Sequence, residues 1–158
     1  MVDLGSTLSS ALIKYYEEVA EKIHGRVDNL STEALWTKPY PYGNSIGHLL
    51  LHLTGNLEDR IGARIVGTSY QRNRELEFAN PHHAPKEEVL AAFDAAMNLV
   101  FSTIRLQSAE DWLVEYVAAT GPPAPDRLSI FIRCLTHCNH HLGQIIYLTK
   151  EIDRLGIY

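Results

Sequence analysis

Histidine is the residue type whose number and spacing in this chain most directly suggest chemistry. The sequence contains eight histidines, and seven of them fall into three groups: His48 and His52; His82 and His83; and His137, His140 and His141. On a helix, residues four apart lie about 40° apart around the axis and about 6 Å apart along it, so both imidazoles can reach one ion. Such pairs offer two neutral nitrogen ligands to a transition metal. Two pairs with this spacing therefore predict a metal site between two helices.

A structural role accounts for the same spacing if the histidines are half-buried helix residues whose second nitrogens find hydrogen-bond acceptors, or if they are simply solvated. His140 lies about 100° around a helix from His141, which favours a position at the rim of any site. His82 and His83 fall in a predicted loop, where exposure to solvent is the simpler interpretation. The presence of two pairs on facing helices favours metal binding over these alternatives.

Four amphipathic helices can position these residues. Apolar side chains recur every three or four positions within residues 8–25, 45–67, 85–104 and 126–148, the period of a helix with one buried face. Pro85 and the acidic residues after it suit a helix start, and the proline-rich segment 121–125 forces the last helix to begin near Asp126. The pattern predicts an all-α fold, a four-helix bundle.

The connections between these helices are less regular in sequence. Residues 30–39 read as a short capped segment, with Ser31 or Thr32 as the cap and Pro39 as the breaker. Residues 67–85 combine glycine, asparagine and proline with mixed charges, which predicts a long irregular connection between the second and third helices of the bundle. The longest strand-like alternation is the five residues at 114–118.

Composition limits the classes of protein to which the chain can belong. With 158 residues and 46% hydrophobic content, residues 1–158 are expected to form a single domain around one core. A net charge of −5 and a pI near 5.9 argue against nucleic acid as a partner. We expect no secretory leader and no membrane span. Cys134 and Cys138 read as a reduced pair, which favours the cytoplasm.

Three stretches of the sequence resemble a known family. Residues 137–150 carry H-x-x-x-H-x-G-Q followed by a leucine and a basic residue, similar to the closing helix of DinB-like proteins. Residues 45–57 resemble the second helix of that family, in which a histidine after an apolar triplet supplies a metal ligand; His52 matches that position. Residues 72–78 are similar to an R-x-R-x-x-E-F segment found in one branch of the family. The resemblance spans residues 45 to 150.

The resemblance implies a DinB/YfiT-like bundle in which His52, His137 and His141 bind a divalent metal. Three imidazoles leave the ion an open position, as in catalytic rather than structural sites. Zinc or nickel suits these ligands best, and iron, manganese or copper is compatible with them. His48 remains an alternative, either as a fourth ligand or in place of His52, or it packs beside His52.

The same resemblance implies a function. Several relatives use the metal to activate a low-molecular-weight thiol for transfer to an electrophilic small molecule, so we expect a thiol transferase or a metal-dependent hydrolase acting on a small-molecule substrate. The alternative is a non-catalytic protein that binds a metal or small ligand in a stress response. We also expect a homodimer.

Four further residues are assigned from their positions. Asn56 and Gln144 each lie one helical turn beyond a histidine and are candidates to contact the ligands or a substrate. Glu58 and Asp59 are expected on the solvated face of their helix. Cys134 falls on an apolar stripe and is interpreted as a small core residue rather than a nucleophile.

Overall fold

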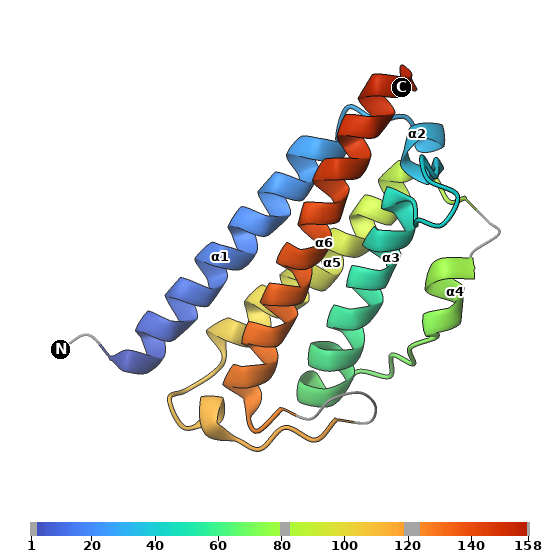
Figure 1. The fold of residues 1–158 in the computed structure, drawn as a ribbon. Coiled ribbons are helices and arrows are strands. Elements are labelled where there is room, and N and C mark those ends of the chain that lie inside the picture. The colour runs from blue at the N-terminus through green and yellow to red at the C-terminus, as the bar shows by residue number, and fades with distance from the viewer. Residues whose placement is uncertain (1–2, 80–82, 119–123, 158) are drawn as a thin grey trace.

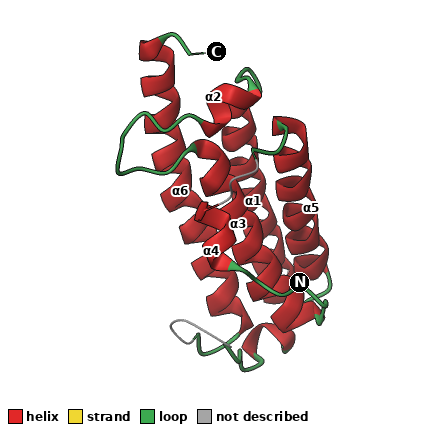
Figure 2. Ribbon diagram, turned by 90° about the vertical axis from the view of Figure 1, so that its right-hand side faces the viewer, coloured by secondary structure: helices red, strands yellow, loops and turns green. Residues whose placement is uncertain are grey.

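The computed structural model describes residues 3–79, 83–118 and 124–157, and it is built almost entirely from helices (Figure 1). The four long helices are α1 (Leu4–Val27), α3 (Ile46–Leu57), α5 (Lys86–Arg105) and α6 (Arg127–Leu155). They pack side by side, and Figure 2 shows the same bundle turned by 90°. In the described ranges, β-structure is limited to an isolated bridge between Glu115 and Asp126. The predicted all-α class is therefore confirmed.

Polar side chains fix where α1 and α6 begin. The carboxylate of Asp3 accepts a hydrogen bond from the Ser6 amide at the start of α1, and Asp126 accepts one from the Ser129 amide at the start of α6. Each bond satisfies a backbone donor that has no partner within the helix. The start of α6 is where the sequence placed it, although Gly121–Pro123 lie outside the described residues. α6 extends beyond Leu148, the last residue of the apolar stripe seen in the sequence, and stops at Gly156, whose φ is 68°.

The second helix of the bundle has a change in winding that the sequence did not predict. α3 is α-helical from Ile46 to Leu57, and the chain then continues as a nine-residue π-helix, η1 (Glu58–Val66). It ends at Gly67, with φ 83°, which is the predicted boundary. π-Helical turns are rare and are frequently found at functional sites.

Short helices occupy the connections. α2 (Thr32–Trp36) lies within the short segment expected at 30–39, and the side chain of Ser31 caps it. The connection from 67 to 85 is less irregular than predicted, because it contains α4 (Arg74–Ala79), which packs against α3. A single-turn helix, η2 (Asp111–Leu113), follows α5. α4 is the element that brings residues of this connection to the candidate site.

The buried apolar residues of the four long helices and α2 form the core. Within the core, the Tyr16 hydroxyl donates to the carbonyl of Phe131 at 2.7 Å, which ties α1 to α6. Cys134 and Cys138 are free thiols buried in this core, as expected of a reduced pair. None of the helices in the described part of the chain has the length and apolar character needed to cross a membrane.

One ionic contact links α1 to α5 near the surface. His24 Nε2 lies 2.7 Å from Asp94 Oδ1, and its Nδ1 lies 3.1 Å from Asp28 Oδ1. Burial alone would lower the pKa of His24, but the hydrogen bonds to Asp94 and Asp28 outweigh it and raise the pKa above its usual value. The folded protein therefore favours the protonated imidazole.

This contact predicts a dependence of stability on pH. Its stabilisation is complete below the pKa of histidine in the unfolded chain and is lost as pH rises through the higher folded pKa. We expect it to contribute about 0.5–1 kcal/mol to the free energy of unfolding at about pH 6, and to lose most of that by about pH 8, since both aspartates are partly exposed. Urea denaturation of the wild type and His24→Gln should differ at the lower pH and converge at the higher. A constant difference across that range would contradict the assignment.

Candidate metal centre

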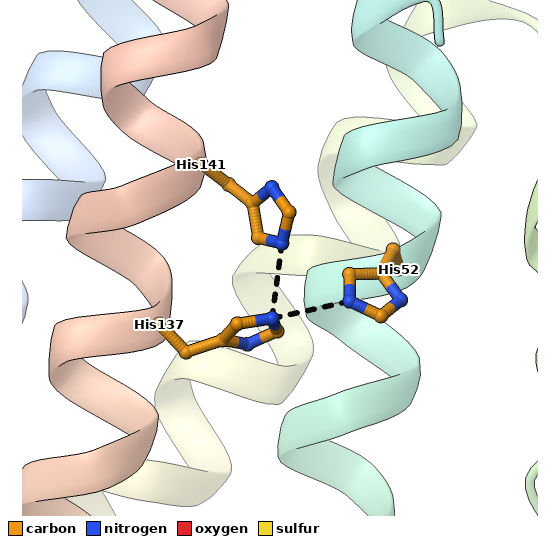
Figure 3. Close-up of side chains that lie close together, drawn as sticks. All are labelled: His52, His137 and His141. Carbon is orange, nitrogen blue, oxygen red and sulfur yellow. Dashed lines mark hydrogen bonds between the residues drawn. The ribbon is translucent and has the colours of Figure 1, made fainter.

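Three histidine side chains from two helices meet between α3 and α6 (Figure 3). His137 Nε2 lies 3.1 Å from His52 Nε2 and 2.9 Å from His141 Nε2. The potential ligand atoms of all three residues lie within 4.8 Å of one another. His137 and His141 are one turn apart on α6, and His52 reaches them from α3. The structure thus brings together the three residues that the sequence singled out.

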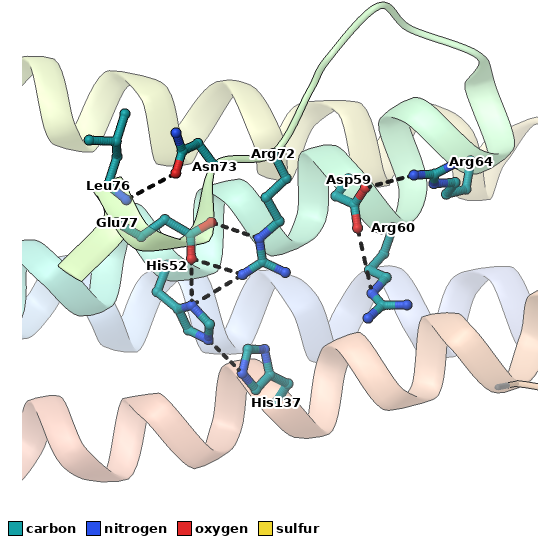
Figure 4. A network of polar contacts seen from close by, with 9 residues as sticks. All are labelled: His52, Asp59, Arg60, Arg64, Arg72, Asn73, Leu76, Glu77 and His137. Carbon is teal, nitrogen blue, oxygen red and sulfur yellow. Dashed lines mark hydrogen bonds and ion pairs between the residues drawn. The ribbon is translucent and has the colours of Figure 1, made fainter. Parts of the chain in front are cut away.

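His52 is held from behind by a buried ion pair (Figure 4). Its Nδ1 lies 2.8 Å from Glu77 Oε2, and Arg72 Nε donates to Glu77 Oε1 at 2.6 Å. Arg72 Nη2 donates to Glu77 Oε2 at 2.9 Å, so the guanidinium engages both carboxylate oxygens. Glu77 comes from α4, the helix within the connection that was predicted to be irregular. Long-range contacts from that connection therefore orient the imidazole of His52.

Gly55 allows α4 to approach α3 this closely. A Cβ atom at residue 55 would overlap with the carboxylate of Glu77 and lie 3.2 Å from the hydroxyl of Tyr70. Only glycine leaves room for the carboxylate to reach His52, which lies on the preceding turn of the same helix. The glycine and the Glu77–Arg72 pair therefore act together in positioning His52.

The surroundings of Glu77 and Arg72 favour the charged form of both side chains. Burial alone would raise the pKa of Glu77, but hydrogen bonds from Arg72 and His52 lower it below its usual value. Burial would likewise lower the pKa of Arg72, and the hydrogen bonds to Glu77 raise it instead. The carboxylate is thus ionised and can only accept. Arg72 Nη2 also lies 3.2 Å from His52 Nδ1, but the contact of that nitrogen with Glu77 Oε2 is shorter, at 2.8 Å, so the proton of a neutral His52 lies on Nδ1 and its Nε2 presents a lone pair.

His141 is oriented in the same manner by its own helix. Its Nδ1 lies 2.6 Å from Gln144 Oε1, which places the proton on Nδ1 and leaves Nε2 as an acceptor. Gln144 Nε2 in turn lies 3.5 Å from His140 Nε2. The expectation that Gln144 contacts a ligand agrees with this geometry. His140 is exposed, as expected of a residue at the rim.

The positions of the protons on the three imidazole rings favour a cation bound between them. His52 and His141 both direct a lone pair at Nε2 of His137, which has at most one proton to donate. When all three rings are neutral and no cation is bound, at least one of the two contacts brings two lone pairs together. The other nitrogen of His137, Nδ1, is buried and has no hydrogen-bond partner among the described residues. A divalent ion among the three Nε2 atoms would replace these repulsive contacts by coordinate bonds.

The electrostatics of the cluster favour the neutral imidazoles of His137 and His141. Burial, together with the neighbouring His141 and His52, lowers the pKa of His137 to about 4. Burial also lowers the pKa of His141, and the hydrogen bond to Gln144 opposes this without reversing it. Because metals bind the unprotonated ring nitrogen, these two residues are available as ligands at neutral pH.

His48 does not join the cluster. Its Nδ1 lies 2.5 Å from the hydroxyl of Ser45, and its amide donates to the same hydroxyl, which forms a capping box at the start of α3. Its ring packs edge-on against Trp36, with centroids 5.2 Å apart. The interpretation of His48 as a fourth ligand or a substitute for His52 is therefore not supported. The ring of His83 stacks on that of Trp36, with centroids 4.9 Å apart, and His82 lies outside the described residues.

Two buried acidic residues differ from what the sequence suggested. Asp59 was expected on a solvated face, but it is 6% exposed and forms ion pairs with Arg60 and Arg64 (Figure 4). Glu77 was not recognised as a partner of His52. The only signal for it in the sequence was the R-x-R-x-x-E-F pattern, which contains both Arg72 and Glu77.

Fold and site together define a class of protein: an all-α bundle with a three-histidine candidate metal centre between two of its helices. The chain belongs to the family described as "Protein of unknown function (DUF1572)", which matches residues 3–155. It is also similar to a solved structure described as the conserved protein of locus from Enterococcus faecalis, with a TM-score of 0.73 and 16% identity, over 96% of this chain and 98% of that one. That similarity supports the fold alone. No curated protein matches the chain.

Proposed function

We propose that this protein is a metal-dependent enzyme in which Nε2 of His52, His137 and His141 binds a divalent ion. The observation that carries the proposal is the convergence of these three nitrogens, two of them fixed as lone-pair donors by Glu77 and Gln144. Zinc or nickel is the ion that suits imidazole ligands best, and iron or manganese is compatible with them. The same residues form the ligand set implied by the DinB-like resemblance.

A divalent ion held by three neutral imidazoles keeps its full charge and an open position, and it lowers the pKa of a water or thiol that binds there. The residues of the chain have two tasks around it. Glu77 and Gln144 fix the orientations of two ligand rings through Nδ1, which sets where the open position points. A small cavity borders His137 and provides space for a ligand beside the cluster.

We further propose that the reaction is transfer of a low-molecular-weight thiol to an electrophilic small molecule, or hydrolysis by metal-activated water. The resemblance of residues 45–57 and 137–150 to DinB-like proteins supports this choice. Cys134 is unsuited to replace an external thiol as the nucleophile, because burial raises its pKa to about 12. The expectations of a homodimer and of no nucleic-acid partner stay predictions, testable by light scattering and by titration with DNA at low salt.

Cobalt substitution tests the proposal directly. Metal-free protein is titrated with Co²⁺, and the visible spectrum reports both stoichiometry and coordination. We expect about one ion per chain and a spectrum that changes when a small thiol is added, because a three-ligand site keeps an exchangeable position. Failure to bind Co²⁺ or Zn²⁺ would refute the metal site. A bound ion with a spectrum insensitive to thiols and other small ligands would favour the non-catalytic alternative.

A further inference from the structure

We propose that the cavity beside the three-histidine cluster binds the anionic group of the substrate, a carboxylate or a phosphate. This assignment rests on the proposed function in treating the ligand of the cavity as the substrate. The cavity has a volume of about 140 Å³ and is lined by six residues from α3, η1 and α6: Asn56, Arg60, Ile130, Arg133, Cys134 and His137.

The position of the cavity places its occupant next to the metal centre. His137 forms part of its wall and also supplies the central nitrogen of the cluster. Asn56 is one turn beyond His52 on α3, so the cavity follows directly from the cluster along both helices. A volume of about 140 Å³ is smaller than the roughly 300–1,000 Å³ of pockets that enclose whole drug-sized ligands. It suits one functional group of a substrate.

The positively charged side chains that line the cavity favour an anionic ligand. Arg60 and Arg133 contribute two guanidinium groups from opposite helices, and no carboxylate lines the cavity. Planar guanidinium groups match the oxygens of carboxylates and phosphates and form strong charge-assisted hydrogen bonds with them.

Arg60 is held in place while its donors remain available. Its side chain is 13% exposed, and its Nε lies 3.8 Å from Asp59 Oδ2, a distance at which charges attract without forming a hydrogen bond. Asp59 divides its charge between this contact and one of 3.5 Å to Arg64. A guanidinium has five N–H donors, so the contacts of Arg60 with Asp59 and with the hydroxyl of Tyr116 orient it and leave donors for a ligand.

The π-helix accounts for the orientation of Arg60. η1 begins at Glu58, two residues before Arg60, and its wider winding turns the following side chains away from the directions that a continued α-helix would give. The hydroxyl of Tyr116 donates to the carbonyl of Arg60 at 3.1 Å and ties this turn to the segment after η2. The unusual winding therefore occurs where a cation is presented to the cavity.

The other residues that line the cavity favour binding of a ligand group rather than its reaction with a protein nucleophile. Ile130 and Cys134 supply an apolar surface from α6. Because burial raises the pKa of Cys134 to about 12, its thiol stays neutral and does not repel an anion. Exclusion of water by such a surface strengthens the hydrogen bonds that the arginines form.

A second arginine-lined cavity provides the control. It lies among Asp59, Arg64, Tyr70, Gln71, Arg72 and Arg74. It suits an anion less well, because the carboxylate of Asp59 lines it and Arg72 already engages Glu77 through two hydrogen bonds. Arg74→Gln removes a charge from that cavity and leaves the one beside His137 unchanged.

Calorimetric titration of metal-free and zinc-loaded protein with succinate, inorganic phosphate and neutral succinamide tests the proposal. We expect succinate or phosphate to bind at millimolar concentration and succinamide not to bind. Arg60→Gln and Arg133→Gln should each weaken anion binding about 10- to 100-fold, the loss of a hydrogen bond to a charged group, while Arg74→Gln has no effect. Tighter binding of succinate or of phosphate identifies the group that the cavity binds as a carboxylate or a phosphate. Arg60→Lys, which keeps the charge beside Asp59, should retain part of the affinity.

Several results would overturn the proposal: absence of anion binding, equal affinity in the wild type and Arg133→Gln, or weakening by Arg74→Gln instead. Binding that requires zinc but neither arginine would place the anion on the ion alone. The proposals of a metal site and of an anion site can be tested separately. Binding of an anion to metal-free protein that depends on the arginines would support the anion site even if the histidines bind no metal. Arg133 is exposed, so Arg133→Gln remains informative if Arg60→Gln fails to fold.

Discussion

His141→Ala is expected to lower bound metal from about one ion per chain to background, a loss of affinity of more than about 100-fold. The substitution removes one of three ligands and leaves two nitrogens on different helices, which cannot enclose an ion. The loss should exceed the roughly 10- to 100-fold effect of residues that only orient a ligand. His52→Ala and His137→Ala should behave in the same way, and elemental analysis after dialysis against dilute zinc measures all three.

His48→Ala is the matched control, because it removes a histidine from the same helix as His52. The ring of His48 faces Ser45 and Trp36 rather than the cluster, so metal content should equal that of the wild type. The variant should lose some stability through its capping box, by about 1 kcal/mol. Equal loss of metal in His48→Ala and His141→Ala would contradict the proposed ligand set, as would metal retained in every variant.

The second large effect is expected at Glu77. Glu77→Ala should lower the free energy of unfolding by about 3–5 kcal/mol, because it leaves the guanidinium of Arg72 buried without its counter-charge. The side chains of Glu77 and Arg72 are 7% and 14% exposed, so water cannot replace the lost partner at low cost. Chemical denaturation of the metal-free protein measures this effect separately from any contribution of a bound ion.

Two further variants separate the roles of Glu77. Glu75→Ala lies on the same short helix at an exposed position, and its effect should stay within about 0.5 kcal/mol. Glu77→Gln keeps an oxygen that can accept from His52 Nδ1 but not the charge that Arg72 requires. It should weaken metal binding by about 10- to 100-fold while remaining folded. A destabilisation by Glu77→Ala no larger than that by Glu75→Ala would refute the buried ion pair.

The long helices were predictable because their signals are local. Apolar periodicity gave α1, α5 and α6, and a proline-rich break located the start of α6 near Asp126. The pair His137 and His141 was predictable for the same reason, since helical geometry alone brings residues four apart to one side. What could be derived from spacing in a single helix was confirmed by the fold.

The choice between His48 and His52 could not be made from periodicity, because both lie on one face of α3. The structure separates them through an interaction that is also local: Ser45 is the N-cap, and His48 stands at the third helical position, where it completes a capping box. A polar residue three positions after a serine cap is therefore a signal that a residue is engaged at a helix end.

The contacts of Asp59 and Glu77 were beyond what spacing could predict. Asp59 lies seven residues, or two helical turns, beyond His52 and therefore near the same face of the helix, but its charge assigned it to solvent; it is buried through contacts with Arg60 and Arg64 that spacing does not reveal. Glu77 reaches His52 across a connection of 25 residues, and its role depends on the packing of α4 against α3 at Gly55. Both residues are buried charges, which composition alone assigns to the surface.

His52 and His137 are 85 residues apart in the chain, yet their Nε2 atoms are 3.1 Å apart. An ion bound by both acts as a cross-link that closes this long loop, and cross-links over long loops most reduce the entropy of the unfolded chain. Binding to the folded chain alone also raises the melting temperature with increasing metal concentration. Thermal unfolding therefore reports occupancy of the centre without knowledge of any substrate, and it can rank candidate ions before an assay exists.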